Sequence, residues 1–160
     1  KTLLIDFDLR RPAAHVLFDL ENERGMCEVL QGSADIDDVI QSTSDGVDVV
    51  SGGHCCEESL FGLSNNHDLL VQCFRDLRSR YDNIVVDTSP VLPVVDALLV
   101  GEHCDAAIVS VLRDVSQLHK IEAAAQRLAS IGIKVLGAVV ACKASDSYYG
   151  HAYYHSSVEA

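Results

Sequence analysis

The chain has 160 residues, of which 48% are hydrophobic, and this is enough to form the core of one domain. Its formal charge of −12 argues against nucleic acid as a partner, because such binding depends on Lys and Arg side chains that neutralise phosphates. No run of 18 apolar residues and no signal-peptide pattern occurs, so neither a transmembrane helix nor a secretion signal is predicted within these residues. The chain enters an apolar run directly after Lys1-Thr2, and we expect further residues upstream.

Apolar runs alternate with helical periods along the chain. Strands are predicted at residues 3–5, 47–50, 83–87, 106–112 and 134–141, and helices at residues 26–30, 36–40, 69–77 and 118–131. Continuous apolar strands separated by helices are typical of α/β domains, in which helices cover both faces of a mostly parallel sheet. The predicted domain comprises residues 1–144. The apolar period then stops, and residues 145–160 are predicted to form a flexible tail.

Acidic side chains follow two of the predicted strands. Asp6 and Asp8 come after the first strand, and Asp87 comes at the end of the third, followed by Thr88. Ligands of open α/β sheets bind beyond the carboxyl ends of the strands, and carboxylates there can hold a hydrated Mg²⁺. A single strand-terminal Asp is more often a helix cap, but three such acids with Arg10 and Arg11 nearby favour a phosphate site.

The six cysteines do not have the spacing of a metal site. His54-Cys55-Cys56 places two cysteines side by side, which suits a tetrahedral metal poorly, and no second pair completes it. We therefore expect reduced cysteines, with Cys73 on an apolar helix face and Cys142 at a strand end acting as small buried hydrophobes.

Four of the five tyrosines lie near the end of the chain, in a segment that has no helical or strand period. Such a segment has no means of burying aromatic rings. By itself this pattern also fits an adhesive segment without a part in catalysis. The four tyrosines are Tyr148, Tyr149, Tyr153 and Tyr154.

Three motifs, in chain order, resemble those of the bacterial tyrosine kinases, which are P-loop enzymes of the deviant-Walker class involved in exporting capsular and exopolysaccharides. "LLIDFDLRRP" (residues 3–12) resembles their apolar run followed by D-x-D-x-R, and "GMCEVLQG" (25–32) resembles their G-L-x-x-x-L-x-G helix. "IVVDTSPVLPVVDA" (84–97) resembles their Walker B segment, and the tyrosine-rich tail resembles their autophosphorylated cluster.

The resemblance implies a role for each matching residue. Asp6, Asp8 and Asp87 would be catalytic. Asp6 would orient or deprotonate the tyrosine hydroxyl, Asp8 would hold Mg²⁺ or place the attacking group, and Asp87 would hold Mg²⁺ through water. The residues that would contact ATP or its phosphates are Arg10, Arg11 and Thr88. A surface ion pair is an equal alternative for Arg11. Asp96 would either pair with a base near the site or cap a helix, and we favour the cap.

The implied reaction is phosphoryl transfer from Mg-ATP to the four tail tyrosines, in trans between protomers of a ring. Phosphorylation would break the ring and regulate polysaccharide synthesis and export. The domain would be cytoplasmic, held at the inner face of the cell membrane by a membrane adaptor or by an upstream transmembrane segment.

The chain departs from the family pattern at three places. No G-x-x-x-x-G-K-[ST] loop, the Walker A cradle for phosphates, occurs in these residues. Ser89-Pro90 stands where the family has two prolines, and Ala141-Cys142 stands where it has a base-contacting Asn. Two alternatives therefore stay open, a catalytically degenerate regulator or scaffold of polysaccharide export and a partitioning-type P-loop ATPase.

Overall fold

The computed structural model describes residues 1–54 and 67–142. The chain divides into two compact units, Lys1–Cys104 and Asp105–Ala160. Among the described residues, no helix is long and apolar enough to cross a membrane.

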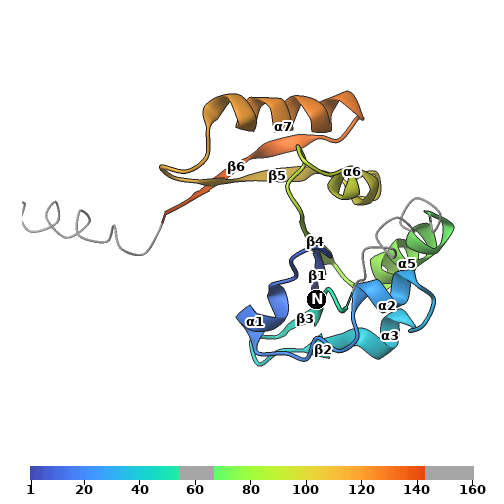
Figure 1. The fold of residues 1–160 in the computed structure, drawn as a ribbon. Coiled ribbons are helices and arrows are strands. Elements are labelled where there is room, and N and C mark those ends of the chain that lie inside the picture. Colours follow the sequence, from blue (N-terminus) through green and yellow to red (C-terminus); the bar gives the residue numbers. More distant parts are fainter. Residues whose placement is uncertain (55–66, 143–160) are drawn as a thin grey trace, which may run out of the picture. The chain divides into compact units, whose positions relative to one another are not determined.

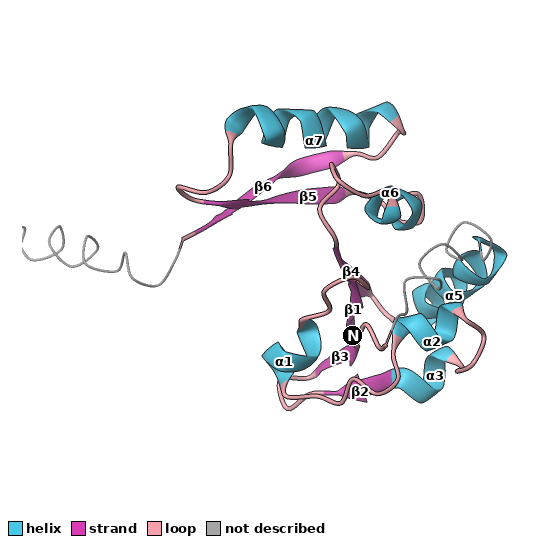
Figure 2. Cartoon of the chain, in the orientation of Figure 1, coloured by secondary structure: helices cyan, strands magenta, loops and turns pink. Residues whose placement is uncertain are grey.

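The first unit is built on a four-stranded sheet with the order β2-β3-β1-β4 (Figures 1 and 2). The strands are β1 (Thr2–Phe7), β2 (Ile40–Ser42), β3 (Val47–Val50) and β4 (Asn83–Thr88). β1 runs parallel to both β3 and β4, and the short edge strand β2 runs antiparallel to β3. The carboxyl ends of the three parallel strands therefore meet at one edge of the sheet.

Helices lie on both sides of this sheet. The helices of the first unit are α1 (Ala14–Phe18), α2 (Met26–Leu30), α3 (Ile36–Val39), α5 (His67–Arg80) and α6 (Asp96–Gly101). In Figure 1, α1 lies on one side of the sheet and α2, α3 and α5 lie on the other.

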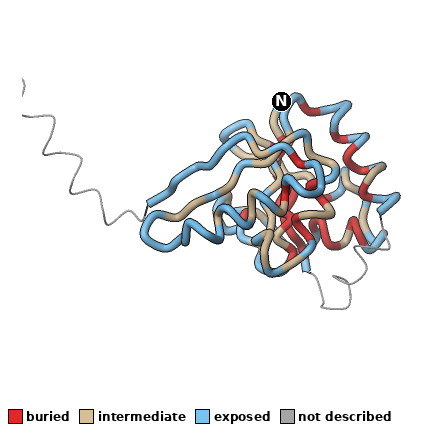
Figure 3. Tube along the Cα trace, turned by 90° about the horizontal axis from the view of Figure 1, so that it is seen from above, coloured by how far each residue is buried: buried red, intermediate tan, exposed pale blue. Residues whose placement is uncertain are grey.

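The core of this unit lies between β1 and the group α2, α3 and α5. Side chains alternate along a strand, so Leu3, Ile5 and Phe7 share one face of β1, and each is at most 1% exposed. Figure 3 shows the buried stretches of the chain in red. α5 contributes the apolar face Leu70, Cys73, Phe74 and Leu77, as its sequence period predicts. Leu69, which the same period places on that face, is exposed instead.

The described part of the second unit, residues 105–142, is a βαβ element. β5 (Ala107–Leu112) and β6 (Val135–Ala141) pair in parallel, and α7 (Leu118–Ser130) connects them and packs on the strands. Parallel neighbouring strands need such a crossover, because the chain must return to the starting edge of the sheet before the second strand begins, and a tight turn joins only antiparallel strands. The pairing has one irregularity, between Ala107 and Ile108.

The predicted α/β class is confirmed, and all five predicted strands are present with bounds shifted by at most two residues. The sequence reading missed β2, α1 and α6, which have three to six residues each. It placed residue 40 in a helix, whereas α3 ends at Val39 and Ile40 begins β2.

The cysteines follow the prediction in part. Burial raises the pKa of the Cys73 thiol to about 11, which suits an unreactive core residue. Cys104 and Cys142 are also free thiols, but Cys142 is exposed and not buried as expected. Cys27 is disulfide-bonded, so the expectation of reduced cysteines is wrong for this residue.

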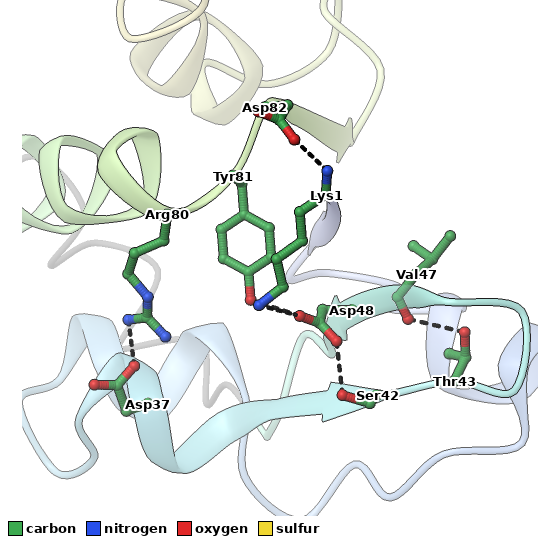
Figure 4. A network of polar contacts seen from close by, with 9 residues as sticks. All are labelled: Lys1, Asp37, Ser42, Thr43, Val47, Asp48, Arg80, Tyr81 and Asp82. Carbon is green, nitrogen blue, oxygen red and sulfur yellow. Dashed lines mark hydrogen bonds and ion pairs between the residues drawn. The ribbon is translucent and has the colours of Figure 1, made fainter.

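A network of polar side chains lies at the edge of the sheet where the parallel strands β1, β3 and β4 begin (Figure 4). The Asp48 carboxylate accepts hydrogen bonds from Ser42 Oγ (2.7 Å) and Tyr81 Oη (2.8 Å), and Lys1 Nζ lies 3.1 Å from it. The bond from Ser42, followed by those from Tyr81 and Lys1, lowers the pKa of Asp48. Strands β2 and β3 are thereby tied to the residue that follows α5.

Candidate active site

The three predicted acids meet at the opposite edge, where β1 and β4 end. The register of these parallel strands sets Asp6 beside Asp87 and Phe7 beside Thr88. Asp8 follows the last paired residue of β1. The strand-terminal acids therefore gather at one edge of the sheet, as the sequence predicts.

Asp6 is fully buried, and its carboxylate accepts three backbone hydrogen bonds. Oδ1 accepts from the N–H of Asp8 at 3.1 Å, while Oδ2 accepts from Ala13 at 2.8 Å and from Ala14 at 2.9 Å. The last two donors belong to the start of α1, whose own N-cap residue, Ala13, has no capping side chain. Asp6 thus satisfies the first amides of a helix that begins eight residues further along the chain.

Asp8 shapes the turn after β1. Its Oδ1 accepts a hydrogen bond from the Arg11 N–H at 3.2 Å, and its carbonyl oxygen accepts from the same N–H at 3.0 Å. The side chain is half-buried. Within the described residues, only Oδ1 of the Asp8 carboxylate accepts a hydrogen bond, whereas both carboxylate oxygens of Asp6 accept one.

Negative charge is crowded around Asp87. Its pKa is raised, first by burial and then by the nearby carboxylates of Asp6 and Asp8, while a backbone hydrogen bond from Thr88 acts in the other direction. Carboxylates crowded at one site disfavour each other's ionisation, and a bound cation removes this penalty.

The donor set fits a hydrated Mg²⁺ better than a metal held by protein ligands alone. Mg²⁺ keeps several waters and needs only one or two carboxylates beside the phosphates of its ligand. Asp8 and Asp87 supply such oxygens. Within residues 1–54 and 67–142, no group of three or more His, Cys, Asp or Glu side chains could enclose a metal.

Arg10 is paired with Asp96, 86 residues away along the chain. Arg10 Nε lies 2.7 Å from Asp96 Oδ2, and Nη2 lies 3.4 Å from Oδ1. Asp96 is buried in the first turn of α6, where the N-cap Val95 has no side-chain cap. The preference for Asp96 as a helix cap was therefore wrong, and the alternative of pairing with a base near the site is correct.

The other predicted phosphate contacts lie on the same edge of the sheet. Arg11 has an exposed side chain in the turn after β1, and no ion pair of this side chain occurs among the described residues. Thr88 is the last residue of β4 and is half-buried. Their contacts with ATP stay predictions.

The sequence reading missed the residues that hold the glycine-rich segment after β3. The Asn22 side chain accepts from the Gly53 N–H at 2.9 Å and donates to its carbonyl at 3.3 Å. Glu28 Oε2 accepts from the Gly25 N–H at 2.7 Å, and Oε1 accepts from the His54 N–H at 3.2 Å. The Gly25-x-x-Glu28 spacing is that of a capping box and was the available signal.

Two predicted features lie outside the described residues. They are the four tail tyrosines, Tyr148, Tyr149, Tyr153 and Tyr154, and the pair Cys55-Cys56. The expected phosphoacceptor role of the tyrosines therefore stays a prediction.

Comparison with known proteins places this arrangement in a family. Residues 1–131 match the family model described as AAA domain. The tyrosine-protein kinase etk of Escherichia coli K12 is 33% identical over 141 residues, which cover 88% of this chain and 19% of that protein. The chain thus spans about a fifth of that relative.

Solved structures agree with the fold. The kinase domain of the Escherichia coli tyrosine kinase ETK matches with a TM-score of 0.82 and 31% identity, over 96% of this chain and 60% of that one. The septum site-determining protein MinD of Pyrococcus horikoshii shares the fold, with a TM-score of 0.71 at 22% identity, over 88% of this chain and 57% of that one. The chain therefore belongs to the AAA domain family, and its recognition as a domain of the bacterial tyrosine kinase type is confirmed.

Proposed function

We propose that this chain is the greater part of a protein-tyrosine autokinase domain that transfers phosphate from Mg-ATP to tyrosines of neighbouring protomers. The observation that carries the proposal is the meeting of Asp6, Asp8 and Asp87 at the carboxyl edge of β1 and β4. Support also comes from relatives named tyrosine-protein kinases. The phosphate cradle would come from residues upstream of Lys1.

In this proposal, Asp8 and Asp87 would hold Mg²⁺, Asp87 through water, and the ion would supply positive charge to neutralise the phosphates during transfer. A bond forms between the tyrosine oxygen and the γ-phosphorus, the bond from that phosphorus to the bridging oxygen breaks, and ADP leaves. The hydroxyl proton passes to a carboxylate.

The contacts divide the roles of the two acids after β1. Both carboxylate oxygens of Asp6 already accept backbone hydrogen bonds, whereas Asp8 has an oxygen that described contacts leave unused. We therefore assign the orientation of the hydroxyl to Asp8 and the positioning of the turn and α1 to Asp6. Arg11 and Thr88 would contact phosphate, and Arg10 would hold the same loop through Asp96.

The phosphate acceptors in the proposal are the tail tyrosines. A phosphate adds about −1.5 to −2 charges at neutral pH, so several on one tail would repel subunits whose formal charge is already −12. Phosphorylation would thus separate the protomers of a ring and regulate capsule or exopolysaccharide export. We place the ring at the cytoplasmic face of the membrane, with a membrane-spanning adaptor or upstream segment.

The test uses the complete gene product, incubated with Mg-ATP and probed for phosphotyrosine. Asp8→Asn and Asp87→Asn are each expected to lower the rate at least a hundredfold, because each removes a carboxylate from the transferred phosphate's surroundings. Asp6→Asn is expected to lower both the rate and the unfolding midpoint. Asp45→Asn, in the exposed turn between β2 and β3, serves as the matched control.

Failure of the complete wild-type protein to form phosphotyrosine would contradict the kinase proposal, as would equal rates for wild type and Asp8→Asn. A protein that also binds no nucleotide would instead be a regulator or scaffold, an alternative favoured by Ser89-Pro90 and Ala141-Cys142. Stimulation of ATP hydrolysis by DNA or lipid would indicate a partitioning-type ATPase.

A further inference from the structure

Ser89 has a buried hydroxyl that makes no hydrogen bond within the described residues. The residue is 3% exposed, and its Oγ has neither a donor nor an acceptor at hydrogen-bond distance in residues 1–54 and 67–142. Leaving a buried hydroxyl unpaired is unfavourable, and native structures contain few such groups. An orphaned polar atom of this kind calls for a partner, and a bound ligand can supply one.

The place of Ser89 in the sheet points to that state. Pairing between β1 and β4 ends at Phe7 and Thr88, so Asp8 and Ser89 are the first residues beyond the paired parts of two neighbouring parallel strands. Asp87, on β4, lies two residues before Ser89, which follows the strand. The unpaired hydroxyl is thus at the edge that carries the candidate magnesium and phosphate groups.

Ser89 is also a feature of this chain, and not of the motif that it resembles. That motif has a proline at this position, and a proline side chain has neither donor nor acceptor. The substitution adds a neutral hydrogen-bond donor beside carboxylates, which repel phosphate oxygens and cannot donate while ionised.

We propose that Ser89 Oγ donates a hydrogen bond to the bound Mg-nucleotide, either to a phosphate oxygen or to a water held by the metal. This inference rests on the proposed function, because it needs a nucleotide at this edge. Ser89 is then a further binding residue, and the nucleotide supplies the acceptor that its hydroxyl lacks among the described residues.

The test compares wild type with Ser89→Ala in the complete gene product. We expect about tenfold weaker binding of a non-hydrolysable ATP analogue with Mg²⁺, measured by calorimetry, because a hydrogen bond to a charged group is lost. The unfolding midpoint of the nucleotide-free protein is expected to stay unchanged or to rise by about 2 °C, because an unpaired buried hydroxyl has been removed.

A second titration, with EDTA in place of Mg²⁺, separates the two acceptors. A loss of affinity that persists without the metal identifies a phosphate oxygen, and a loss seen only with Mg²⁺ identifies a metal-bound water. Ser42→Ala is the matched control. Ser42 donates to Asp48 at the opposite edge, so its loss should lower the midpoint and leave nucleotide affinity unchanged.

Equal analogue affinities for wild type and Ser89→Ala would overturn the inference. So would a fall of both affinity and midpoint, because Ser89 would then support the fold. A wild-type protein that binds the analogue but forms no phosphotyrosine would contradict the kinase proposal alone, and the Ser89 inference would still be decided by the affinities. A wild-type protein that binds no nucleotide would overturn both.

Discussion

Asp87 is a residue at which function and stability oppose each other. Its pKa is raised in the folded chain, mainly by burial and then by Asp6 and Asp8. A raised pKa means that the folded state disfavours the ionised carboxylate. The contribution of Asp87 to stability is therefore most favourable below its unfolded pKa of about 4 and is lost as the pH rises through the higher folded pKa.

Asp87→Asn is accordingly expected to raise the unfolding midpoint of the metal-free protein at pH 7 by about 1–2 °C, since it removes a disfavoured charge. The gain should vanish near pH 3, where the carboxyl group is protonated in both states. Thermal unfolding at the two pH values measures this, with Asp45→Asn as the control. A lower midpoint at pH 7 would show that the ionised Asp87 stabilises the fold.

The site contains residues that local sequence patterns predict and residues that they do not. The acids Asp6, Asp8 and Asp87 were predictable because strand ends are visible in the sequence and parallel strands end at a common edge. The partner of Arg10 lies 86 residues away, and no local signal distinguishes a paired Asp96 from a helix cap. The unpaired state of Ser89 depends on burial by several segments, which is a tertiary property.

At the scale of elements, α2 depends on close contact with the loop after β3. A Cβ added at Gly25 would meet Ser51 O at 2.2 Å and Gly53 N at 2.5 Å. Both contacts are with backbone, which has little freedom to move. Gly25 therefore allows the start of α2 to lie directly against the segment that follows β3.

Gly25→Ala is expected to destabilise the chain by about 2–3 kcal/mol, because the loop and the helix must separate. Gly46→Ala is a suitable comparison. Gly46 has a φ of +77° in a turn where an added Cβ would meet nothing within 4 Å, so its cost is backbone strain of about 1 kcal/mol. Urea unfolding of both variants measures the difference, and equal losses would argue against the close contact.

The elements that hydrophobic periodicity does not predict are short helices and strands. α5 and α7 each span three turns or more, and their apolar period predicts them. α1 has five residues, and its first amides are satisfied by Asp6, a residue of the preceding strand. β2 has three residues and exists through its pairing with β3. Neither is long enough to carry a period of its own.

At the scale of the whole molecule, the fifth tyrosine, Tyr81, lies outside the tail segment and within the first unit. Tyr81 is 6% exposed, and its hydroxyl donates to Asp48 (Figure 4). Its pKa is raised, first by burial and then by Asp48. A kinase active site cannot reach this hydroxyl without opening the edge of the sheet.

Phosphosite mapping of the complete protein after autophosphorylation is expected to find Tyr81 unmodified, with phosphate confined to tail tyrosines. Tyr81→Phe should leave the phosphate content unchanged and destabilise the first unit by about 1 kcal/mol, because Asp48 loses a hydrogen bond. Phosphate on Tyr81 in the folded protein, or a fall in phosphate content with Tyr81→Phe, would contradict this prediction.

The sequence alone determined the α/β class, the order of the five main strands and the acids at the ends of two of them. These properties are written in local periods and in the residues that follow each apolar run. Tertiary structure decided which polar groups are paired: Asp6 with the amides of α1, Arg10 with Asp96, and Ser89 with none. The physical reason is that pairing and burial depend on segments that are distant in the chain and meet only when the sheet has formed.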